Sequence, residues 1–289
     1  MTLTPGKLTI SVVLYKNDPN HLEQLCNSLM LCDLDFKIYF FDNSPTDELS
    51  QYFDQTKGFH YQWSNKNIGY GPGHNVILDQ TLHQGTYHLA MNADVFFEAG
   101  TLERIVAFMD QKEDVGLLLP RVLNPDGTEQ PLYKLLPKPQ DLFVRRFIPG
   151  IFKNIFEKSL QSYRMSFADE RSTFDAPYLS GCFMFMRKEA LRQVGTFDPR
   201  FFLYCEDVDL SRRIRQRWRT TYFADAHIYH YFFKGSYRNL RLLRHHITSA
   251  VKYFNKYGWL YDTEREQINS QTLKAFISDK ESISFSQAK

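Results

Sequence analysis

The chain has 289 residues, of which 43% are hydrophobic and 24% are charged, so it can build one large domain or two small ones with ample core. Its formal net charge of +2 indicates no polyanionic partner, and nucleic acid is therefore not expected. The sequence has four scattered cysteines without zinc-ligand spacing, no signal peptide and no apolar run near ~20 residues, which favours a reduced cytoplasmic protein with at most peripheral membrane contact.

The first half of the chain alternates strand and helix patterns. An apolar run at residues 8–15, rich in β-branched side chains, predicts a buried strand, and a helix is expected from Asp18 to about Leu31. Further strands are predicted at residues 37–41, 59–63 and 87–91. Because helical stretches separate these strands, we expect βαβ units and a mainly parallel sheet.

Polar clusters follow three of these strands, at residues 42–43, 67–69 and 92–94. In open parallel sheets, ligands bind beyond the carboxyl ends of the strands. Packing does not readily explain three such clusters at equivalent places, so we interpret them as candidate ligand-binding residues.

The second half has a different pattern. Residues 134–164 are basic, aromatic and punctuated by proline, and residues 179–186 predict another apolar strand. A helix is expected from Glu206, followed by a short strand near residues 221–224 and a loop over residues 227–236. A basic helix is predicted from about Arg238 to Lys256. The chain after Asp262 is polar, and we expect it to be loosely attached.

Three carboxylates crowd the first turn of the helix that begins at Glu206: Glu206, Asp207 and Asp209. They follow an aromatic run at residues 201–204. A carboxylate at a helix start, walled by aromatic side chains, is well placed to accept a proton in a cleft. The alternative is structural, because acids at the start of a helix and bases at its end complement the helix dipole by about 0.3–1 kcal/mol each.

A glycine-rich stretch at residues 67–75 precedes a helix pattern. Its spacing is G-x-G-x-G with Pro72 inside, which disfavours a dinucleotide-binding turn of the G-x-G-x-x-G type. Glycines that let the backbone approach a nucleotide or a sugar remain a plausible interpretation.

Asp94 and His230 are candidate metal ligands. Asp94 follows an apolar strand, where a carboxylate costs free energy unless it is paired or binds a cation such as Mg²⁺. His230 follows another strand and could complete a site for a divalent metal. The alternatives are an Asx turn at Asp94 and a structural histidine at position 230, with His227 as a competing ligand.

The segment of residues 142–156 is short, amphipathic and cationic. It could lie at an anionic membrane surface, or it could be an ordinary packing helix with a basic outer face.

Taken in order, these motifs resemble those of family 2 glycosyltransferases, the inverting GT-A enzymes, over residues 8 to 259. The stretches that carry the resemblance are 10–15, Asp42-Asn43-Ser44, Asn67-Ile68-Gly69 with Gly71 and Asn75, Asn92-Ala93-Asp94, 180–191, 206–210 and 226–230. The resemblance implies a GT-A fold, a Rossmann-like and mainly parallel α/β sheet flanked by helices. It also implies a domain over residues 1–260, with a nucleotide-sugar-binding half (1–120), an acceptor-binding and catalytic half (121–260), and a polar tail (261–289).

The resemblance further implies roles for individual residues. Asp207 would be the general base, and Glu206 would help to hold the loop or the acceptor. Asp94 and His230 would hold Mg²⁺ or Mn²⁺ together with the donor's diphosphate. The implied donor-binding residues are Val13, Tyr15, Asp42, Asn43, Asn67, Gly69, Asn75, Asn92 and Asp94, and the implied acceptor-binding residues are Gly181, Cys182 and Glu206.

Within the family, Leu136-Pro137 and residues 142–146 are similar to the bacterial rhamnosyltransferase-like enzymes of surface-polysaccharide assembly. This implies transfer of rhamnose from dTDP-rhamnose to a saccharide acceptor, lipid-linked, at the inner face of the plasma membrane. The alternatives are a transferase that uses a UDP-sugar (galactose, glucose or GlcNAc), a sugar nucleotidyltransferase, and a catalytically silent carbohydrate-binding subunit. The chain departs from the family at Asn92, where the first Asp of the metal motif stands, and at residues 231–233, which are aromatic.

Overall fold

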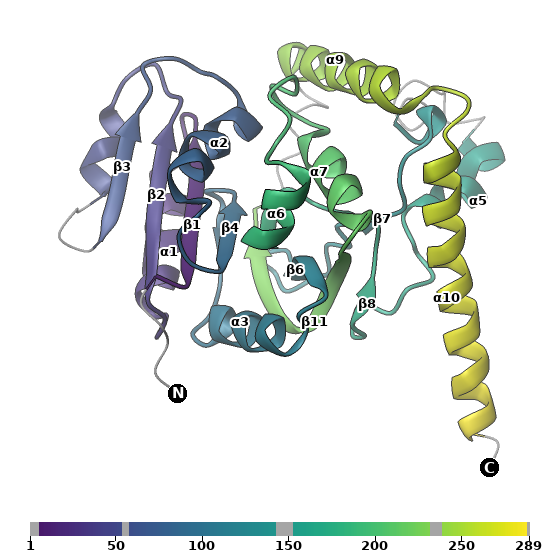
Figure 1. Ribbon diagram of the computed structural model, residues 1–289. Coiled ribbons are helices and arrows are strands. Elements are labelled where there is room, and N and C mark those ends of the chain that lie inside the picture. The colour runs from purple at the N-terminus through teal and green to yellow at the C-terminus, as the bar shows by residue number, and fades with distance from the viewer. Residues whose placement is uncertain (1–5, 54–57, 143–152, 232–238, 288–289) are drawn as a thin grey trace.

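The computed structural model describes residues 6–53, 58–142, 153–231 and 239–287, and its centre is one large sheet flanked by helices (Figure 1). The strand order is β3-β2-β1-β4-β10-β6-β11-β5, and β8 pairs with β11 beside this path. The α/β fold class expected from the sequence is confirmed.

The first half of the sheet is parallel and follows the predicted pattern. Its strands are β1 (Leu8–Leu14), β2 (Phe36–Asp42), β3 (Phe59–Trp63) and β4 (Tyr87–Met91). β1 lies between β2 and β4, and every pairing among the four strands is parallel. The carboxyl ends of these strands therefore meet at one edge, where the polar clusters lie.

The first helix agrees with the predicted span from Asp18 to about Leu31, and further helices connect the other strands. The helices of this half are α1 (Pro19–Met30), the 3₁₀ helix η1 (Glu48–Tyr52), α2 (Tyr70–Thr81) and α3 (Thr101–Gln111). The Asp18 side chain caps α1 by accepting a hydrogen bond from the Asn20 N–H at 2.9 Å. Pro19 occupies the first turn, where its missing N–H costs nothing.

The second half of the sheet is mixed rather than parallel. β10 (Phe183–Arg187) runs antiparallel to both β4 and β6 (Val115–Leu123), and β11 (Arg219–His230) runs parallel to β6. The short strands are β5 (Val95–Phe96) and β8 (Phe174–Asp175), which pair antiparallel with β11, and β7 (Tyr133–Lys134) and β9 (Tyr178–Leu179), which form a second small sheet.

Two expectations for this half need correction. The single strand predicted over residues 179–186 is divided into β9 and β10 by a turn at residues 180–182. The loop predicted to begin at His227 is wrong for residues 227–230, which continue β11 as far as His230. Pairing with β6 and β5 overrides the polar and aromatic composition there, because those neighbours supply the backbone hydrogen bonds.

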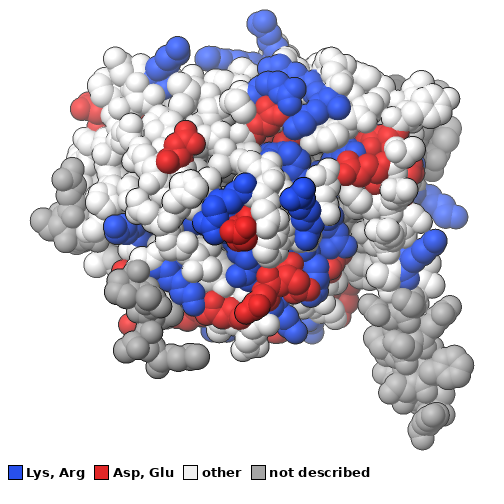
Figure 2. Space-filling model, in the orientation of Figure 1, with Lys and Arg blue, Asp and Glu red and all other residues white. Residues whose placement is uncertain are grey.

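The remaining helices are α5 (Lys153–Tyr163), α6 (Lys188–Val194), α7 (Glu206–Arg215), α9 (Leu240–Tyr257) and α10 (Thr263–Gln287). The predicted basic helix is α9, which buries Ser249, Ala250, Tyr253 and Phe254 at helical spacing and lies across the top of the molecule (Figure 1). Lys and Arg side chains gather along this upper edge (Figure 2). No helix in the described ranges is both long enough and apolar enough to cross a membrane.

The expectation of a loosely attached tail is wrong for residues 262–273. The carboxylate of Asp262, which is 6% exposed, accepts hydrogen bonds from the Arg212 guanidinium at 2.7 and 2.6 Å. Asn269 of α10 bonds both the N–H and the carbonyl of Leu136, at 2.8 and 2.9 Å. These contacts are polar and join residues far apart in the sequence, so hydrophobic periodicity could not predict them.

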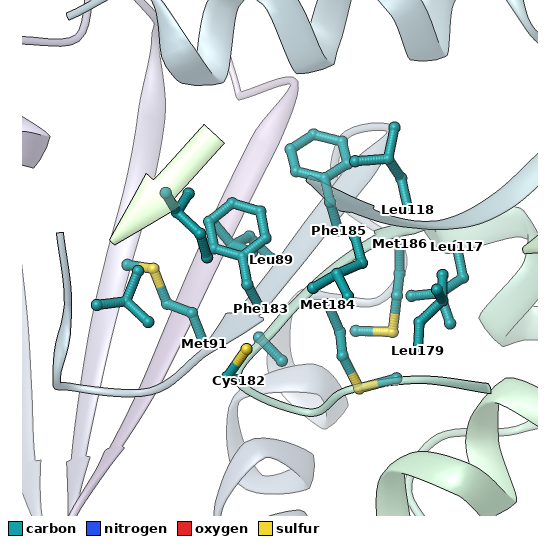
Figure 3. Close-up of a cluster of buried hydrophobic side chains, with 14 of the residues drawn as sticks. Leu89, Met91, Leu117, Leu118, Leu179, Cys182, Phe183, Met184, Phe185 and Met186 are labelled. Carbon is teal, nitrogen blue, oxygen red and sulfur yellow. The ribbon is translucent and has the colours of Figure 1, made fainter. Parts of the chain in front are cut away.

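The hydrophobic core is continuous across the two halves of the sheet. Figure 3 shows its centre, where apolar side chains from β4, β6 and β10 pack together. The labelled members are Leu89, Met91, Leu117, Leu118, Leu179, Cys182, Phe183, Met184, Phe185 and Met186. Because this core fixes β4 against β10, it sets the distance between the polar edge of the first half and the residues that follow β9.

Candidate active site

Asp207 lies in the first turn of α7, beside the turn that joins β9 to β10. Its Oδ2 atom accepts hydrogen bonds from the Gly181 N–H and from the Tyr178 hydroxyl, both at 3.0 Å. Its Oδ1 atom accepts one from the Val208 N–H at 2.8 Å. A carboxylate has about four acceptor positions, so this half-buried side chain is held in place and still has room for one more donor.

The turn that presents Asp207 is strained. Tyr204 and Cys205, directly before α7, have φ angles of +70° and +66°, a left-handed conformation that costs about 1–2 kcal/mol for a residue with a Cβ. The Ser249 hydroxyl of α9 donates to the Leu203 carbonyl at 2.8 Å and holds this turn from outside. Two consecutive strained residues beside a candidate base are the kind of outlier that marks functional sites.

Glu206 differs from its neighbour Asp207 in its surroundings. It is 5% exposed, and its Oε2 atom is buried with no hydrogen-bond partner among the described residues. Burial raises the pKa of Glu206 well above its usual value, and the charge of Asp207 raises it further. Burial and the charge of Asp207 therefore both favour the protonated form of Glu206, which can donate a hydrogen bond.

Tyr70 connects the glycine-rich loop with the place where Asp207, Gly181 and Tyr178 meet, the Asp207 corner. Its hydroxyl donates to the Gly181 carbonyl at 2.7 Å, and its backbone N–H donates to the Phe202 carbonyl at 2.8 Å. Gly69, one residue earlier, has a φ of +103°, and a Cβ there would lie 2.4 Å from the Phe202 oxygen. The glycine at position 69 is therefore required for the loop to pack against the chain that leads to Asp207.

A cavity of about 380 Å³ opens between the end of β1, the glycine-rich loop, the chain near Phe202 and the start of α9. It gathers five of the residues implied to bind the donor: Val13, Tyr15, Asn43, Asn67 and Gly69. The other lining residues are Lys16, Tyr70, Phe202, Leu203, Asn239, Arg241, Leu242 and His245. Since Tyr70 lines the cavity and bonds Gly181, the cavity adjoins the Asp207 corner.

Among the implied binding residues that do not line this cavity, three are engaged elsewhere in the protein. Asp42 is 0% exposed, and its oxygens accept from the Ser44 N–H and the Tyr61 hydroxyl, both at 2.7 Å. The Asn75 amide bonds the carbonyl and the N–H of Phe197, at 2.7 and 3.0 Å. Cys182 is 4% exposed in the core, where burial raises the pKa of its thiol to about 12.

In the structure, Asp42 and Asn75 hold the loops around the cavity, and the Cys182 side chain belongs to the core; their implied roles in binding stay predictions. Gly181 does lie at the corner, but as a support for the candidate base. A Cβ on Gly181 would approach the Asp207 Cβ to 3.1 Å, so the glycine permits the close contact.

Asp94 and His230 meet where β4 and β11 end. The His230 Nε2 atom lies 3.5 Å from Asp94 Oδ1 and 3.5 Å from Asn92 Nδ2. Gln130 Nε2 donates to the His230 carbonyl at 2.7 Å, which turns Gln130 Oε1 towards His230 Nδ1 at 3.1 Å. Nδ1 must then carry the ring proton, and Nε2 presents a lone pair to Asp94.

This arrangement fits a cation. Burial lowers the pKa of His230 against the opposing effect of the Asp94 charge, so the ring is neutral at pH 7. Asp94 Oδ1 is buried without a hydrogen-bond partner in the described parts of the chain, and it faces another acceptor. The same ranges contain no cluster of three His, Cys, Asp or Glu side chains, so the pair suits a metal that takes its other ligands from a substrate phosphate.

Sequence reasoning missed several residues of this site, chiefly Tyr70, Tyr178, Gln130, Arg241 and His245. Tyr70 stood inside the recognised glycine motif, so its position was a usable signal. Gln130 and Tyr178 are joined to their partners across gaps of 100 and 29 residues. No local pattern gives such pairings. The aromatic residues 232–233 and most of the amphipathic segment of residues 142–156 lie outside the described residues.

Residues 10–195, more than half of the chain, match the model of the family described as glycosyl transferase family 2. Over 270 residues the chain is 25% identical to an N-acetylglucosaminyl-diphospho-decaprenol L-rhamnosyltransferase of Mycobacterium tuberculosis, which covers 87% of this chain and 86% of that protein. It is 22% identical over 274 residues to rhamnosyltransferase WbbL of Escherichia coli K12, covering 90% of this chain and 97% of WbbL.

The fold is similar to that of a solved mannosyltransferase, PcManGT of Pyrobaculum calidifontis, crystallised with GDP-mannose and Mn²⁺. The TM-score is 0.54 at 16% identity, over 96% of this chain and 78% of that one. This likeness supports the GT-A fold.

Proposed function

The chain belongs to glycosyl transferase family 2, and we propose that it moves rhamnose from dTDP-rhamnose to a lipid-linked saccharide in bacterial surface-polysaccharide synthesis, with inversion at the anomeric carbon. The observation that carries the proposal is Asp207, a held carboxylate with one open acceptor position beside a cavity of about 380 Å³. The similarity of the chain to two rhamnosyltransferases supports the choice of sugar, and the name of the mycobacterial relative supports a lipid-linked acceptor.

An inverting transfer is a single displacement at the anomeric carbon. The attacking hydroxyl of the acceptor must lose its proton as the bond to the sugar forms, and Asp207 accepts that proton. General base catalysis of this kind contributes about 10²–10⁴-fold. Glu206, whose protonated form is favoured by burial and by the charge of Asp207, donates a hydrogen bond to the acceptor or its loop. Gly181 and Tyr178 keep the base oriented.

The donor occupies the cavity beside Tyr70, with its nucleoside against Val13, Tyr15, Asn43, Asn67 and Gly69. Residues 1–120 thus supply most of the donor side, and residues 121–260 supply the base and the acceptor side.

Asp94 and His230, with Asn92 beside them, would hold Mg²⁺ or Mn²⁺ in the presence of the diphosphate. A bound divalent cation neutralises negative charge that develops on a nucleotide diphosphate leaving group.

The acceptor is met at the cytoplasmic face of an anionic membrane, through a peripheral contact. Two features of α9 and of the turn that follows it support this contact. α9 contains no Asp or Glu and exposes Arg244 and Lys252. Leu260 and Tyr261 in the following turn are 82% and 90% exposed. Each basic side chain near an anionic bilayer contributes about 1 kcal/mol, and this falls with salt.

The test is a transfer assay with the purified full chain. dTDP-rhamnose, UDP-galactose, UDP-glucose and UDP-GlcNAc are offered singly with a polyprenyl-diphosphate-GlcNAc acceptor, and the product is analysed by mass spectrometry and NMR. We expect one rhamnose added per dTDP released, with inverted anomeric configuration. If the chain transferred sugar only from one of the UDP-sugars, that UDP-sugar would be the donor in place of dTDP-rhamnose. Synthesis of a nucleotide sugar from dTTP and a sugar phosphate, or binding without turnover, would contradict the proposed reaction.

The metal is tested separately with Asp94→Ala. In Mn²⁺ we expect this variant to bind dTDP more weakly than the wild type, and in EDTA we expect the difference to shrink. Transfer by the wild type at its full rate in EDTA would contradict the metal assignment.

A further inference from the structure

The donor cavity has a positively charged wall that the mechanism above does not use. Lys16 enters from the end of β1, and Arg241 and His245 enter from the first two turns of α9. None of the described residues that line the cavity is an Asp or a Glu. In the described ranges, no carboxylate forms an ion pair with Arg241 or Lys16. A concave surface with cations and no compensating acid favours an anionic ligand.

The charge comes from side chains and not from the end of the helix. The Asn239 side chain caps α9 by accepting from the N–H groups of Arg241 and Leu242, at 2.8 and 3.3 Å. The first-turn amides are thereby satisfied, so an anion in the cavity would have to be bound by the guanidinium and by the other side-chain cations.

We infer that Arg241, assisted by Lys16 and His245, binds the diphosphate of the nucleotide-sugar donor. This inference rests on the proposed function and names the groups that balance the donor's charge. The candidate metal site of Asp94 and His230 is poor in charge, because among the described residues Asp94 is the carboxylate recorded beside His230, and Asn92 supplies an uncharged amide. Arginine suits the task because its planar guanidinium can bond two phosphate oxygens at once.

α9 is fixed rigidly enough for this role. The His245 ring stacks on the Phe202 ring, with centroids 4.7 Å apart. One helical turn further, the Ser249 hydroxyl bonds the Leu203 carbonyl, and the Lys252 ammonium donates to the Arg200 carbonyl at 2.7 Å. The helix that carries Arg241 is therefore attached to the strained turn that presents Asp207. Donor binding at Arg241 would stabilise the same turn.

His245 makes the affinity depend on pH. Partial burial and the charges of Arg241, Arg244 and Lys252 lower the pKa of His245. A diphosphate beside the ring favours the protonated form, so binding should take up a proton and tighten as the pH falls from 8 to 6.

The test measures the affinity of the full chain for dTDP, dTMP and thymidine, and for the uridine series, by calorimetry in EDTA and again in Mn²⁺. We expect Arg241→Ala to weaken diphosphate binding about ten- to hundredfold in EDTA, as the loss of a charged hydrogen bond predicts. Binding of the nucleosides should stay within twofold. Arg171→Ala is the control, an exposed arginine outside the cavity and outside α9, and it should bind dTDP like the wild type.

Each outcome bears on the inference. Equal losses for diphosphate and nucleoside in Arg241→Ala would mean that the residue only supports the fold, and unchanged dTDP binding would mean that it makes no contact. Either result overturns the inference while the proposed function stands. Failure of the wild type to bind either nucleotide series would overturn the proposed function and the inference with it. A pH effect that disappears in His245→Gln would support the assignment of the second cation.

Discussion

The loops around the cavity and the Asp207 corner use their polar motif residues in different ways. In the loops, Asp42, Asn43 and Asn75 each bond protein partners through both polar side-chain atoms, and they thereby hold the loops in place. At the corner, Asp207 retains an acceptor position, and Glu206 has a buried oxygen without a hydrogen-bond partner among the described residues. The difference teaches that a motif can be diagnostic of a family because it builds the site, while the reacting groups come from elsewhere in the chain.

The buried carboxylate of Asp209 should give the largest change in stability. It is 0% exposed and bonds the Tyr257 hydroxyl and Arg213 Nε, each at 2.8 Å, as well as the Lys256 ammonium. Asp209→Ala leaves Arg213 and Lys256 without their carboxylate partner, and we expect a loss of about 3 kcal/mol in the free energy of unfolding. This is the lower end of the range for a broken buried ion pair, because both cations keep some exposure to solvent.

Chemical denaturation measures this loss, with Asp79→Ala as the control at an exposed acid. The control should change stability by less than about 0.5 kcal/mol. If Asp209→Ala changed the free energy of unfolding as little as the control, the second half would not depend on this ionic attachment of α9.

Gly69→Ala should follow, at about 2–3 kcal/mol, because the new Cβ meets the Phe202 oxygen in a backbone conformation that only glycine adopts freely. Gly127→Ala is the matched control, since Gly127 also has a positive φ, +84°, but open space around it. It should cost about 1–2 kcal/mol from the conformation alone. Similar losses in both variants would show that contact with the Phe202 segment adds nothing.

Asn75→Ala tests whether Asn75 holds a loop or binds the donor. It removes both hydrogen bonds to Phe197, and we expect a loss of about 1–3 kcal/mol in unfolding free energy, with donor affinity reduced only in proportion. Measurement of both quantities decides the case. A variant of wild-type stability that no longer binds dTDP would restore Asn75 as a donor ligand.

The smallest expected effect concerns pH. His74 and His88 are 0% exposed, and burial lowers the pKa of His74 to about 3 and that of His88 well below its usual value. Because the unfolded histidines bind protons from about pH 6.5 downward and the folded ones do not, each group removes about 1.4 kcal/mol of stability per pH unit below that value.

Denaturation between pH 7 and pH 5 should therefore show a steep slope, and His74→Gln should make it shallower by about 1.4 kcal/mol per pH unit. An identical slope in the variant would mean that His74 titrates normally in the folded protein.

Prediction from the sequence was most successful where local pattern decides structure. β3 and β4 span the predicted residues, because apolar strands bounded by turns leave few alternatives. The order of the motifs also singled out Asp207, Asp94 and His230 as candidates, and their roles stay predictions. What could not be predicted depends on partners far away in the chain, such as Gln130 beside His230 and α9 beside Phe202. The burial of Asp42 could not be predicted for the same reason, since it depends on Tyr61 from the neighbouring strand.

The most direct test of the account is the transfer rate of Asp207→Asn. Asn is nearly isosteric, and its one oxygen can still accept from the Gly181 N–H and the Tyr178 hydroxyl, while the bond from the Val208 N–H is lost. The free energy of unfolding should therefore fall by only about 1 kcal/mol, and dTDP affinity should match the wild type. Sugar transfer from dTDP-rhamnose to the lipid-linked acceptor should fall by a factor of about 10² or more, the contribution of a general base. Near-normal turnover in a folded variant that binds the donor would contradict the assignment of Asp207 as the base.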